Sequence, residues 1–301
     1  MKRLLIQLNV AIVLLLSFSY HCVAADTYTL KYNLEKGKTY KQHSVTEMDA
    51  TMNAMGQDIK MDMSMDIDIN YEVTGKNNGV YDIRMAYQKL KMDMTSPTAY
   101  SFDSDAPESS SDNNSIVGAL KSFVGVPIDI QLTQQGKVNS VKGVDKLLGK
   151  MDSVGNPQFK QMLSQQFSEE TIRNMIEQIS AYFPDKPVAI NDSWDVATEV
   201  NTNGVDIDSK MKLTLKQVSD NVATLDCTGT LATPEGGAKF QVQGMDATVK
   251  MNGEQAGTIL IDMKTGWIVR SDLTQNSTQN IELMGQSMQQ KVKTKIILTA
   301  D

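Results

Sequence analysis

The sequence has few of the residues that most catalytic centres and metal sites require. Its 301 residues include two cysteines and two histidines, and one of each, Cys22 and His21, lies in a segment that we expect to be removed. An internal disulfide is then impossible, because Cys227 has no partner. With His43 as the remaining histidine, catalytic triads, histidine-based zinc sites and histidine general bases are not expected.

Long hydrophobic runs are also scarce, and the clearest one lies near the N-terminus. Two basic residues precede an apolar run from Val10 to Tyr20, and small residues of the kind that a signal peptidase reads follow it. The run is too short for a comfortable transmembrane helix. We therefore predict a signal peptide over residues 1–25 with cleavage near Ala25-Asp26. The mature chain is expected to be exported, periplasmic or extracellular, and without a transmembrane segment.

Positive charge is in deficit. The whole chain has 29 Lys and Arg against 36 Asp and Glu, and loss of the leader would leave a net charge of −9. Nucleic acids and anionic lipid surfaces need a basic face, so neither is expected as a partner.

The sequence does have a long stretch of strict alternation. Apolar residues occupy every second position from Ile59 to Val73, and polar residues fill the positions between them. Side chains of a strand alternate between its faces, so one face is apolar and the other is wet. At about 3.3 Å per residue this strand would run about 50 Å, two to three times the usual length. A strand of that length is expected to coil and bend.

Other local patterns predict hairpins and two helices. The strand that returns from the first long strand changes phase near Gln88-Lys89, which predicts a β-bulge. The acidic, serine-rich segment 101–115 predicts an exposed loop. In the middle of the chain we expect one helix that begins at Pro157 and a second that is capped by Ser168 and carries an apolar stripe from Ile172 to Phe183.

These elements predict an α+β, β-rich fold in which a strongly curved antiparallel sheet, or two related sheets, packs over the central pair of helices. An incomplete cover would leave an apolar groove, the most natural functional site. The expected organisation is a signal peptide at 1–25, an N-terminal β-rich half at 26–156, central helices at 157–187 and a C-terminal β-rich half at 188–301.

The two halves share an order of elements. Each has a long amphipathic strand (59–74 and 205–218), a return strand, an irregular excursion (95–125 and 233–254) and a shorter hairpin. An inherited duplication would explain this order. The alternative is that any antiparallel meander shows hairpins at this spacing, without a duplication. Both explanations predict antiparallel sheets.

Methionines of the long strand invite a metal hypothesis. Met61, Met63 and Met65 share one face, and Met92 and Met94 on the return strand could join them. Thioethers are soft ligands that suit monovalent copper. Methionine is also a good filler of cores, and isoleucines occupy the same face of the strand. Core packing is the favoured interpretation, and a soft-metal site remains the alternative.

The other candidate residues indicate structural roles. His43 is interpreted as a surface or half-buried structural residue, and Cys227 as a small buried hydrophobe on the apolar face of its strand. Asp66 and Asp68 lie on the wet face, and their pairing alone predicts no acid–base catalysis. No catalytic, cofactor-binding or metal-binding residue is therefore predicted. A set of loop acids lacks the spacing of a known calcium loop and is interpreted as solvated: Asp103, Asp105, Glu108 and Asp112.

Two segments resemble those of a family of exported bacterial proteins of unknown function. The first is Tyr182-Phe183-Pro184-Asp185-Lys186-Pro187-Val188 with Asn191-Asp192-Ser193-Trp194, and the second is Asp262-x-x-Thr265-Gly266-Trp267. The resemblance implies β-rich halves and central helices over most of residues 28–299, and it supplies no catalytic residue. Where such families usually have Gly, this chain has Asn191, which can adopt the same left-handed backbone. A looser likeness of fold is to periplasmic lipoprotein carriers, in which a curved sheet wraps helices around an acyl-binding cavity.

The sequence thus predicts an exported, non-enzymatic protein that binds an apolar or amphipathic ligand, such as a lipid, between sheet and helices. The alternative is a protein-interaction or envelope-assembly module that meets an envelope protein and has no small-molecule ligand. A hydrolase built from carboxylates and a copper-binding module are less favoured. A carrier would have an internal apolar cavity, whereas an assembly module would have a well-packed core and a surface patch.

Overall fold

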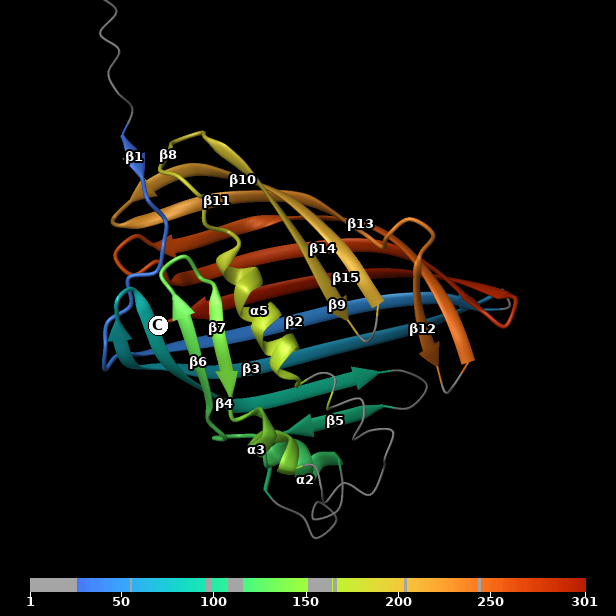
Figure 1. Ribbon diagram of the computed structural model, residues 1–301. Helices are drawn as coiled ribbons and strands as arrows, with labels where there is room; N and C mark the ends of the chain where they lie inside the picture. Colours follow the sequence, from blue (N-terminus) through green and yellow to red (C-terminus); the bar gives the residue numbers. More distant parts are fainter. Residues whose placement is uncertain are drawn as a thin grey trace, which may run out of the picture.

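The computed structural model describes residues 26–54, 56–95, 99–107, 116–150, 164, 167–202, 205–242 and 245–301. The predicted signal peptide lies outside these ranges. Most of the described chain forms one sheet of thirteen strands, and two further strands, β1 (Thr27–Tyr28) and β8 (Val188–Ala189), pair with each other (Figure 1). No helix of the described residues is long and apolar enough to cross a membrane.

The strands of the large sheet are β2 (Thr39–Ala54), β3 (Gln57–Asn77), β4 (Val80–Thr95), β5 (Tyr100–Asp103), β6 (Ile128–Thr133), β7 (Val138–Lys142), β9 (Ser193–Thr202), β10 (Val205–Ser219), β11 (Val222–Ala232), β12 (Ala238–Val242), β13 (Met245–Asp262), β14 (Ile268–Leu283) and β15 (Gln286–Ala300). The helices are α2 (Ile116–Lys121), α3 (Val144–Gly149) and α5 (Glu169–Ser180).

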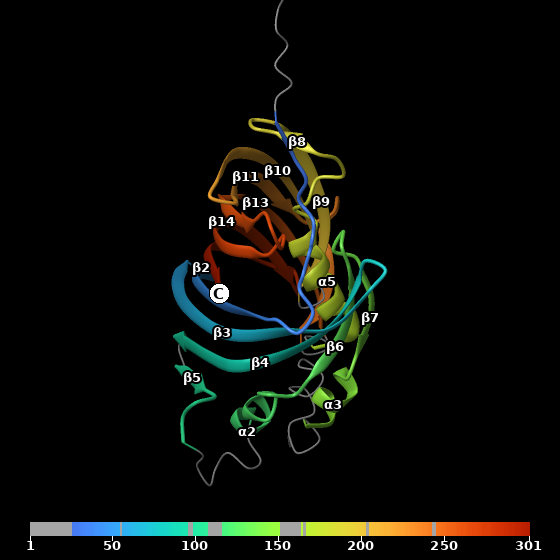
Figure 2. The ribbon, with the colours of Figure 1, turned by 90° about the vertical axis from the view of Figure 1, so that its left-hand side faces the viewer.

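The large sheet consists of two meanders that meet in its middle. The first runs outward from β2 through β3, β4 and β6 to the edge strand β7. The second starts at the opposite edge, β9, and runs inward through β10, β11, β13 and β14 to β15, which pairs with β2. Every pairing is antiparallel, as predicted, and the two halves form one continuous sheet. Seen end-on, this sheet curls into an open half-pipe whose edge strands are not paired with each other (Figure 2).

The long alternating stretch forms β3, which extends from Gln57 to Asn77. Its hairpin with β4 turns at Asn78 and Gly79, whose φ angles of 47° and 78° lie in the left-handed region that Asn and Gly tolerate. The predicted bulge is confirmed: Asp68 pairs with Lys89 and Ile69 pairs with Tyr87, so Gln88 is the extra residue.

Three sequence predictions are corrected by the strands. The excursion expected at 233–254 is wrong beyond Met245, because β13 continues without a break to Asp262. The loop expected from Ser101 begins only after Asp103, since β5 pairs with β4. The strands β9 and the second half of β14 were not expected at all. The inner face of the second half of β14 is polar, with Gln275, Ser277 and Gln279, and this hides the alternation that marks a strand. The inner face of β9 begins with Trp194 and Val196 but continues with Thr198, so its apolar alternation is short.

The second predicted helix is confirmed as α5. Ser168 Oγ accepts a hydrogen bond from the Thr171 amide at 3.0 Å, as an N-cap should. The helix lies between the two edges of the half-pipe and contacts both β7 and β9. Glu177 Oε1 accepts from the Val138 amide of β7 at 2.8 Å, so the helix satisfies part of an exposed strand edge. The predicted first helix lies mostly outside the described residues.

The buried core fills the end of the half-pipe that α5 covers. One cluster belongs to the first meander and includes Tyr81 and Phe123. The other belongs to the second meander and includes Leu213 and Ile259. Helix α5 contributes Ile172 and Ile176 to the first cluster, and Ile179 packs against the second. The core therefore closes one end of the half-pipe.

Candidate ligand-binding trough

Strand register defines which residues line the inside of the half-pipe. Residues that pair directly across an antiparallel ladder point to the same face. Met63 pairs with Met48 and Met94, and the same row continues from Met48 through Thr294 to Gln275. We call the inner-face positions beyond the filled end the trough. They are the alternate residues of 44–52 in β2, 59–67 in β3, 90–94 in β4, 288–296 in β15, 273–281 in β14 and 249–257 in β13.

None of these trough positions carries a charged side chain. The Asp, Glu and Lys residues of the same strand segments fall on the alternate positions and face the convex side. Asp62, Lys293 and Glu254, for example, are exposed. A partly exposed inner face without charge is typical of an interaction surface.

One wall of the trough is made of methionine. Met48, Met63 and Met94 lie side by side on β2, β3 and β4, and Met65 pairs with Met92. Side chains at such positions are about 5 Å apart at Cβ, and all five are only partly buried. Flexible thioether side chains of this kind suit adaptable apolar binding surfaces.

The opposite wall carries neutral polar groups. Gln255 Nε2 donates to Ser209 Oγ at 2.8 Å, and Gln275 Nε2 donates to Gln255 Oε1 at 3.2 Å. Gln255 and Ser209 are buried, each 5% exposed, so the polar groups of this wall that a ligand can reach are Gln275, Ser277 and Gln279 of β14, which are partly exposed. The trough is therefore amphipathic across its width, and neither wall is charged.

Aromatic side chains plug the closed end of the trough. The Trp267 ring lies 4.9 Å from that of Tyr40 and 5.2 Å from that of Tyr71, between ring centroids. The turn that precedes it is fixed by Thr265, whose hydroxyl donates to Asp262 Oδ2 at 2.9 Å and accepts from the Trp267 amide at 3.2 Å. The Asp-x-x-Thr-Gly-Trp motif thus positions this indole.

The other resemblance segment is structural as well. Trp194 Nε1 donates to the Tyr182 carbonyl at 3.1 Å and ties β9 to the end of α5. Asn191 has a φ of 72°, the left-handed backbone that was predicted for this position.

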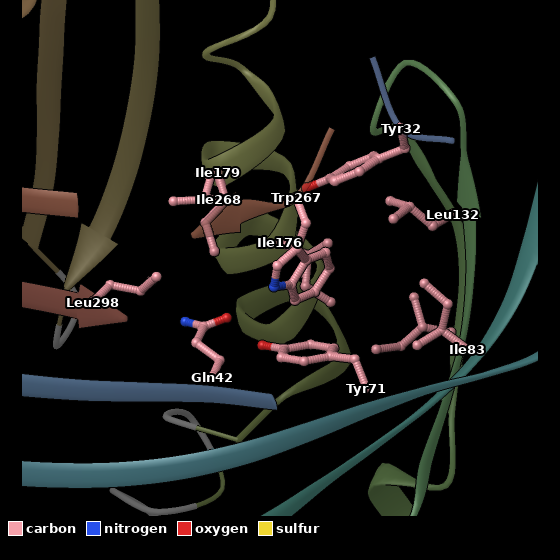
Figure 3. Close-up of a pocket in the computed structure, with 11 residues that line it drawn as sticks. Tyr32, Gln42, Tyr71, Ile83, Leu132, Ile176, Ile179, Trp267, Ile268 and Leu298 are labelled. Atoms are coloured by element: carbon pink, nitrogen blue, oxygen red, sulfur yellow. The ribbon is translucent and has the colours of Figure 1, made fainter. Parts of the chain in front are cut away.

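A small cavity of about 30 Å³ lies beside the aromatic plug. Figure 3 shows Trp267, Tyr71, Gln42 and Leu298 around it, with Ile176 of α5 behind. The indole Nε1 of Trp267 is buried and has no hydrogen-bond partner among the described residues. The sequence patterns predict an apolar groove, but they carry no signal for this unpaired donor, because it depends on neighbours far apart in the chain.

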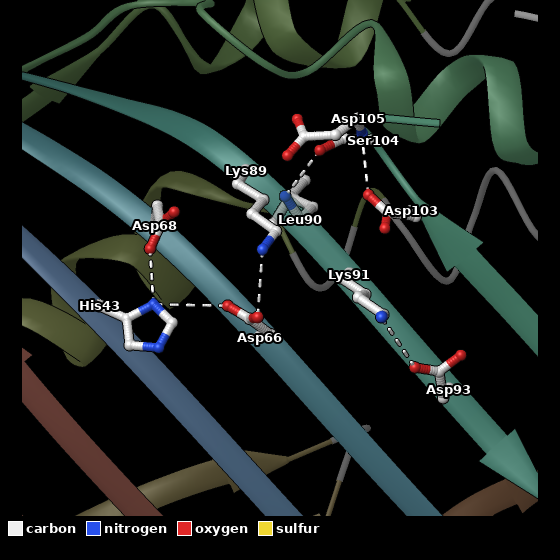
Figure 4. Close-up of polar contacts among 10 residues, drawn as sticks. All are labelled: His43, Asp66, Asp68, Lys89, Leu90, Lys91, Asp93, Asp103, Ser104 and Asp105. Atoms are coloured by element: carbon white, nitrogen blue, oxygen red, sulfur yellow. Dashed lines mark hydrogen bonds and ion pairs between the residues drawn. The ribbon is translucent and has the colours of Figure 1, made fainter. Parts of the chain in front are cut away.

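His43, Asp66 and Asp68 form the group of described residues whose ligand atoms lie close enough together for a metal ion, all within 4.8 Å. They lie on the convex face (Figure 4). His43 Nδ1 is 2.7 Å from Asp68 Oδ1 and 3.4 Å from Asp66 Oδ1, while Lys89 Nζ is 3.3 Å from Asp66 Oδ2. The hydrogen bond and charge of Asp66 raise the pKa of Lys89. Lys89 already supplies positive charge to these carboxylates, so we interpret the group as a chain of ion pairs across β2, β3 and β4. His43 is exposed, which agrees with the surface role predicted for it.

The loop acids are only partly described. The Asp105 amide donates to Asp103 Oδ1 at 2.9 Å, a turn at the end of β5, and Glu108 and Asp112 lie outside the described residues. The methionines Met61, Met63 and Met65 line the trough and are only partly buried, so the favoured interpretation that they pack in the core is wrong. The soft-metal hypothesis for them stays a prediction.

Cys227 is buried, as predicted, with its Sγ 3.5 Å from Met211 Sδ. Burial raises the pKa of its thiol from 9.0 to about 11. Burial thus keeps the thiol protonated near neutral pH, which disfavours reaction of the native side chain as a nucleophile.

We expect the native chain from Asp26 onward not to react with a disulfide reagent such as dithiobis(nitrobenzoate) at pH 8, and the urea-unfolded chain to react stoichiometrically. Because the folded pKa is raised, the stabilising effect of the neutral thiol is present below pH 9 and is lost as the pH rises toward 11. A Cys227→Ala variant is the blank. Rapid labelling of the folded protein would contradict the burial.

The fold and the trough define a β-rich protein with an open, uncharged inner face and a plugged end. The chain belongs to DUF6263, a family of unknown function whose model matches residues 78–268. The resemblance to a family of unknown function is thereby confirmed, and its exported character stays a prediction. No curated protein matches the chain.

Solved structures are only distantly similar. A lipovitellin structure, described by its lipid–protein interactions, has a TM-score of 0.48 at 9% identity, with 89% of this chain and 25% of that chain covered. This chain thus spans about a quarter of that protein. OccK5 of Pseudomonas aeruginosa gives a TM-score of 0.24 at 6% identity (88% and 98% covered), and a DUF1329 family protein of Desulfovibrio piger gives 0.14 at 9% (84% and 83% covered). Scores this low carry no argument about function.

Proposed function

We propose that this protein binds an uncharged apolar or amphipathic ligand, such as a lipid, along the trough, and that it does so after export. One observation supports the proposal above the others: an inner face that spans six neighbouring strands, β4, β3, β2, β15, β14 and β13, carries no charge and is lined in part by partly exposed methionines. Apolar surface left in contact with water gains about 25 cal/mol for each Å² that a ligand covers.

The electrostatics of the trough select against charged ligands. An ion that enters a dry site without a partner loses several kcal/mol of hydration energy. The walls offer amides, hydroxyls and thioethers, which can accompany a neutral polar group but cannot neutralise a charge. The ligand is therefore uncharged along the part that lies in the trough.

The proposal is for binding without catalysis. No trough position holds a carboxylate, a lysine or a histidine that could serve as an acid or base. The thiol of Cys227 is kept neutral by burial. Export rests on the leader-like segment at 1–25, from which we infer a periplasmic or extracellular location.

Native mass spectrometry tests the proposal. The protein is purified from its own envelope without detergent and measured before and after denaturation and solvent extraction. We expect a mass excess of lipid size that extraction removes. A bare mass would contradict ligand binding, and a mass excess of protein size would instead favour the envelope-assembly alternative.

A further inference from the structure

Two buried side-chain polar atoms of the described residues have no hydrogen-bond partner: Asp66 Oδ1 on the convex face and the indole Nε1 of Trp267 in the core. The Trp267 side chain is more than nine-tenths buried, since the residue is 9% exposed. Its Nε1–H can only donate, and no described residue accepts from it. Buried donors of this kind are rare, because leaving one unpaired is unfavourable.

The unpaired donor faces the small cavity at the plugged end of the trough. In Figure 3 the indole nitrogen lies on the side of the ring that faces Gln42 and Leu298. The Tyr71 hydroxyl points into the same space. Burial, and after it the neighbouring phenols Tyr87 and Tyr32, raise the pKa of Tyr71 well above its usual value, so its hydroxyl stays protonated and can donate.

The lining of the cavity contains no charge. Apart from Gln42 and two tyrosines, it consists of Trp267 and aliphatic side chains. An anion would find donors here but no cation, and would lose its hydration. A carbonyl, ester or hydroxyl oxygen would accept from the indole and the phenol without that penalty. The cavity, about 30 Å³, has room for one small group of this kind.

The cavity adjoins the trough along β2. Gln42 lines it and is followed on the inner face of β2 by Ser44, Thr46 and Met48. At about 3.3 Å per residue, Gln42 and Met48 are about 20 Å apart along the strand. A long chain anchored at the cavity would therefore extend over the methionine wall.

We propose that Trp267 Nε1, assisted by the Tyr71 hydroxyl, is the head-group site for the ligand of the trough, and that this head group is an uncharged oxygen acceptor. The inference rests on the proposed function and narrows it: the ligand is a neutral lipid with a carbonyl or hydroxyl at one end. Fatty-acid anions and headless hydrocarbons are the ligands it disfavours.

Three competitors of equal chain length test this site. Displacement of the fluorescent probe N-phenyl-1-naphthylamine from the chain beginning at Asp26 is measured with 2-dodecanone, dodecane and dodecanoate at pH 8. We expect the ketone to bind most tightly and the carboxylate most weakly. In Trp267→Phe the ketone should lose about tenfold in affinity, the equivalent of one hydrogen bond, while dodecane is unchanged.

A matched variant and a second site variant keep the outcome clear. Trp194→Phe removes the other tryptophan, whose Nε1 already donates to the Tyr182 carbonyl, and should leave the preference for the ketone intact. Tyr71→Phe should also reduce the preference for the ketone, as Trp267→Phe does. If Trp267→Phe does not fold, Tyr71→Phe takes its place in the test. Two results would overturn the head-group site without contradicting ligand binding in the trough. The first is that the unsubstituted protein binds dodecane as tightly as 2-dodecanone. The second is that Trp267→Phe loses the same affinity for dodecane as for 2-dodecanone. If neither 2-dodecanone nor dodecane displaces the probe, both the head-group site and the proposed function are contradicted.

Discussion

Met63→Lys is expected to weaken binding of the trough ligand at least 100-fold, which corresponds to about 2.7 kcal/mol. Met63 lies in the middle of the methionine wall between Met48 and Met94. It is partly exposed, so the lysine can extend its ammonium group to water and the fold is retained. A bound ligand would have to cover that charge, and an uncompensated buried ammonium costs several kcal/mol. Displacement of N-phenyl-1-naphthylamine measures the loss.

Ser64→Lys is the matched control for this substitution. It introduces the same side chain one residue later, on the convex face, where its cross-strand neighbours are Glu47 and Asp93. Opposite charges at such positions contribute roughly 0.2–1 kcal/mol, so stability should be unchanged or slightly higher and binding should be normal. Equal binding by both variants would place the ligand outside the trough.

Gly266→Ala is expected to lower the free energy of unfolding by about 3–5 kcal/mol. The residue has a φ of 71°, which disfavours any side chain, and a Cβ would lie 2.1 Å from the Lys31 carbonyl oxygen. That oxygen belongs to backbone and cannot move aside without shifting the segment that carries Tyr32. The measurement is the urea midpoint of unfolding, followed by tryptophan fluorescence.

Gly37→Ala separates backbone strain from the clash. Gly37 has a φ of 84° and nothing within 4 Å of an added Cβ, so its loss should be only the strain of about 1–2 kcal/mol. If Gly266→Ala and Gly37→Ala lowered the free energy of unfolding equally, the close approach of the Lys31 carbonyl would not restrict the side chain at position 266.

Local regularity was enough to predict much of the sheet. The alternation of Ile59 to Val73 gives β3 because a period of two is the direct signature of a strand with one buried face. The phase change near Gln88-Lys89 predicted the bulge, and Ser168 predicted the start of α5. Both features could be predicted because each is determined by a few neighbouring residues. The burial of Cys227 follows from its place on the apolar side of β11.

Regularity failed where the inner face is not apolar. Gly253, Gln255 and Gly257 occupy inner positions of β13, and Gln275 and Gln279 do so in β14, so no hydrophobic period marks these strands. The candidate site was even less accessible to prediction. That the trough lacks charge can be seen only when strands from both ends of the chain are placed in register, and the unpaired indole of Trp267 can be seen only when its surroundings are known.

The junction of β15 with β2 has a consequence for how the protein is made. Gln42 pairs with Ala300, so the middle of the half-pipe is completed by β15, which is synthesised after all the other described strands. Pairings so distant in sequence fold slowly, because a large loop must close first. Until then each meander presents a long open edge, the kind of surface on which chains aggregate. Since the floor of the trough is shared between the two meanders, neither has a binding surface of its own. The proposed capacity to hold a ligand therefore arises in a single late step, when β15 pairs with β2.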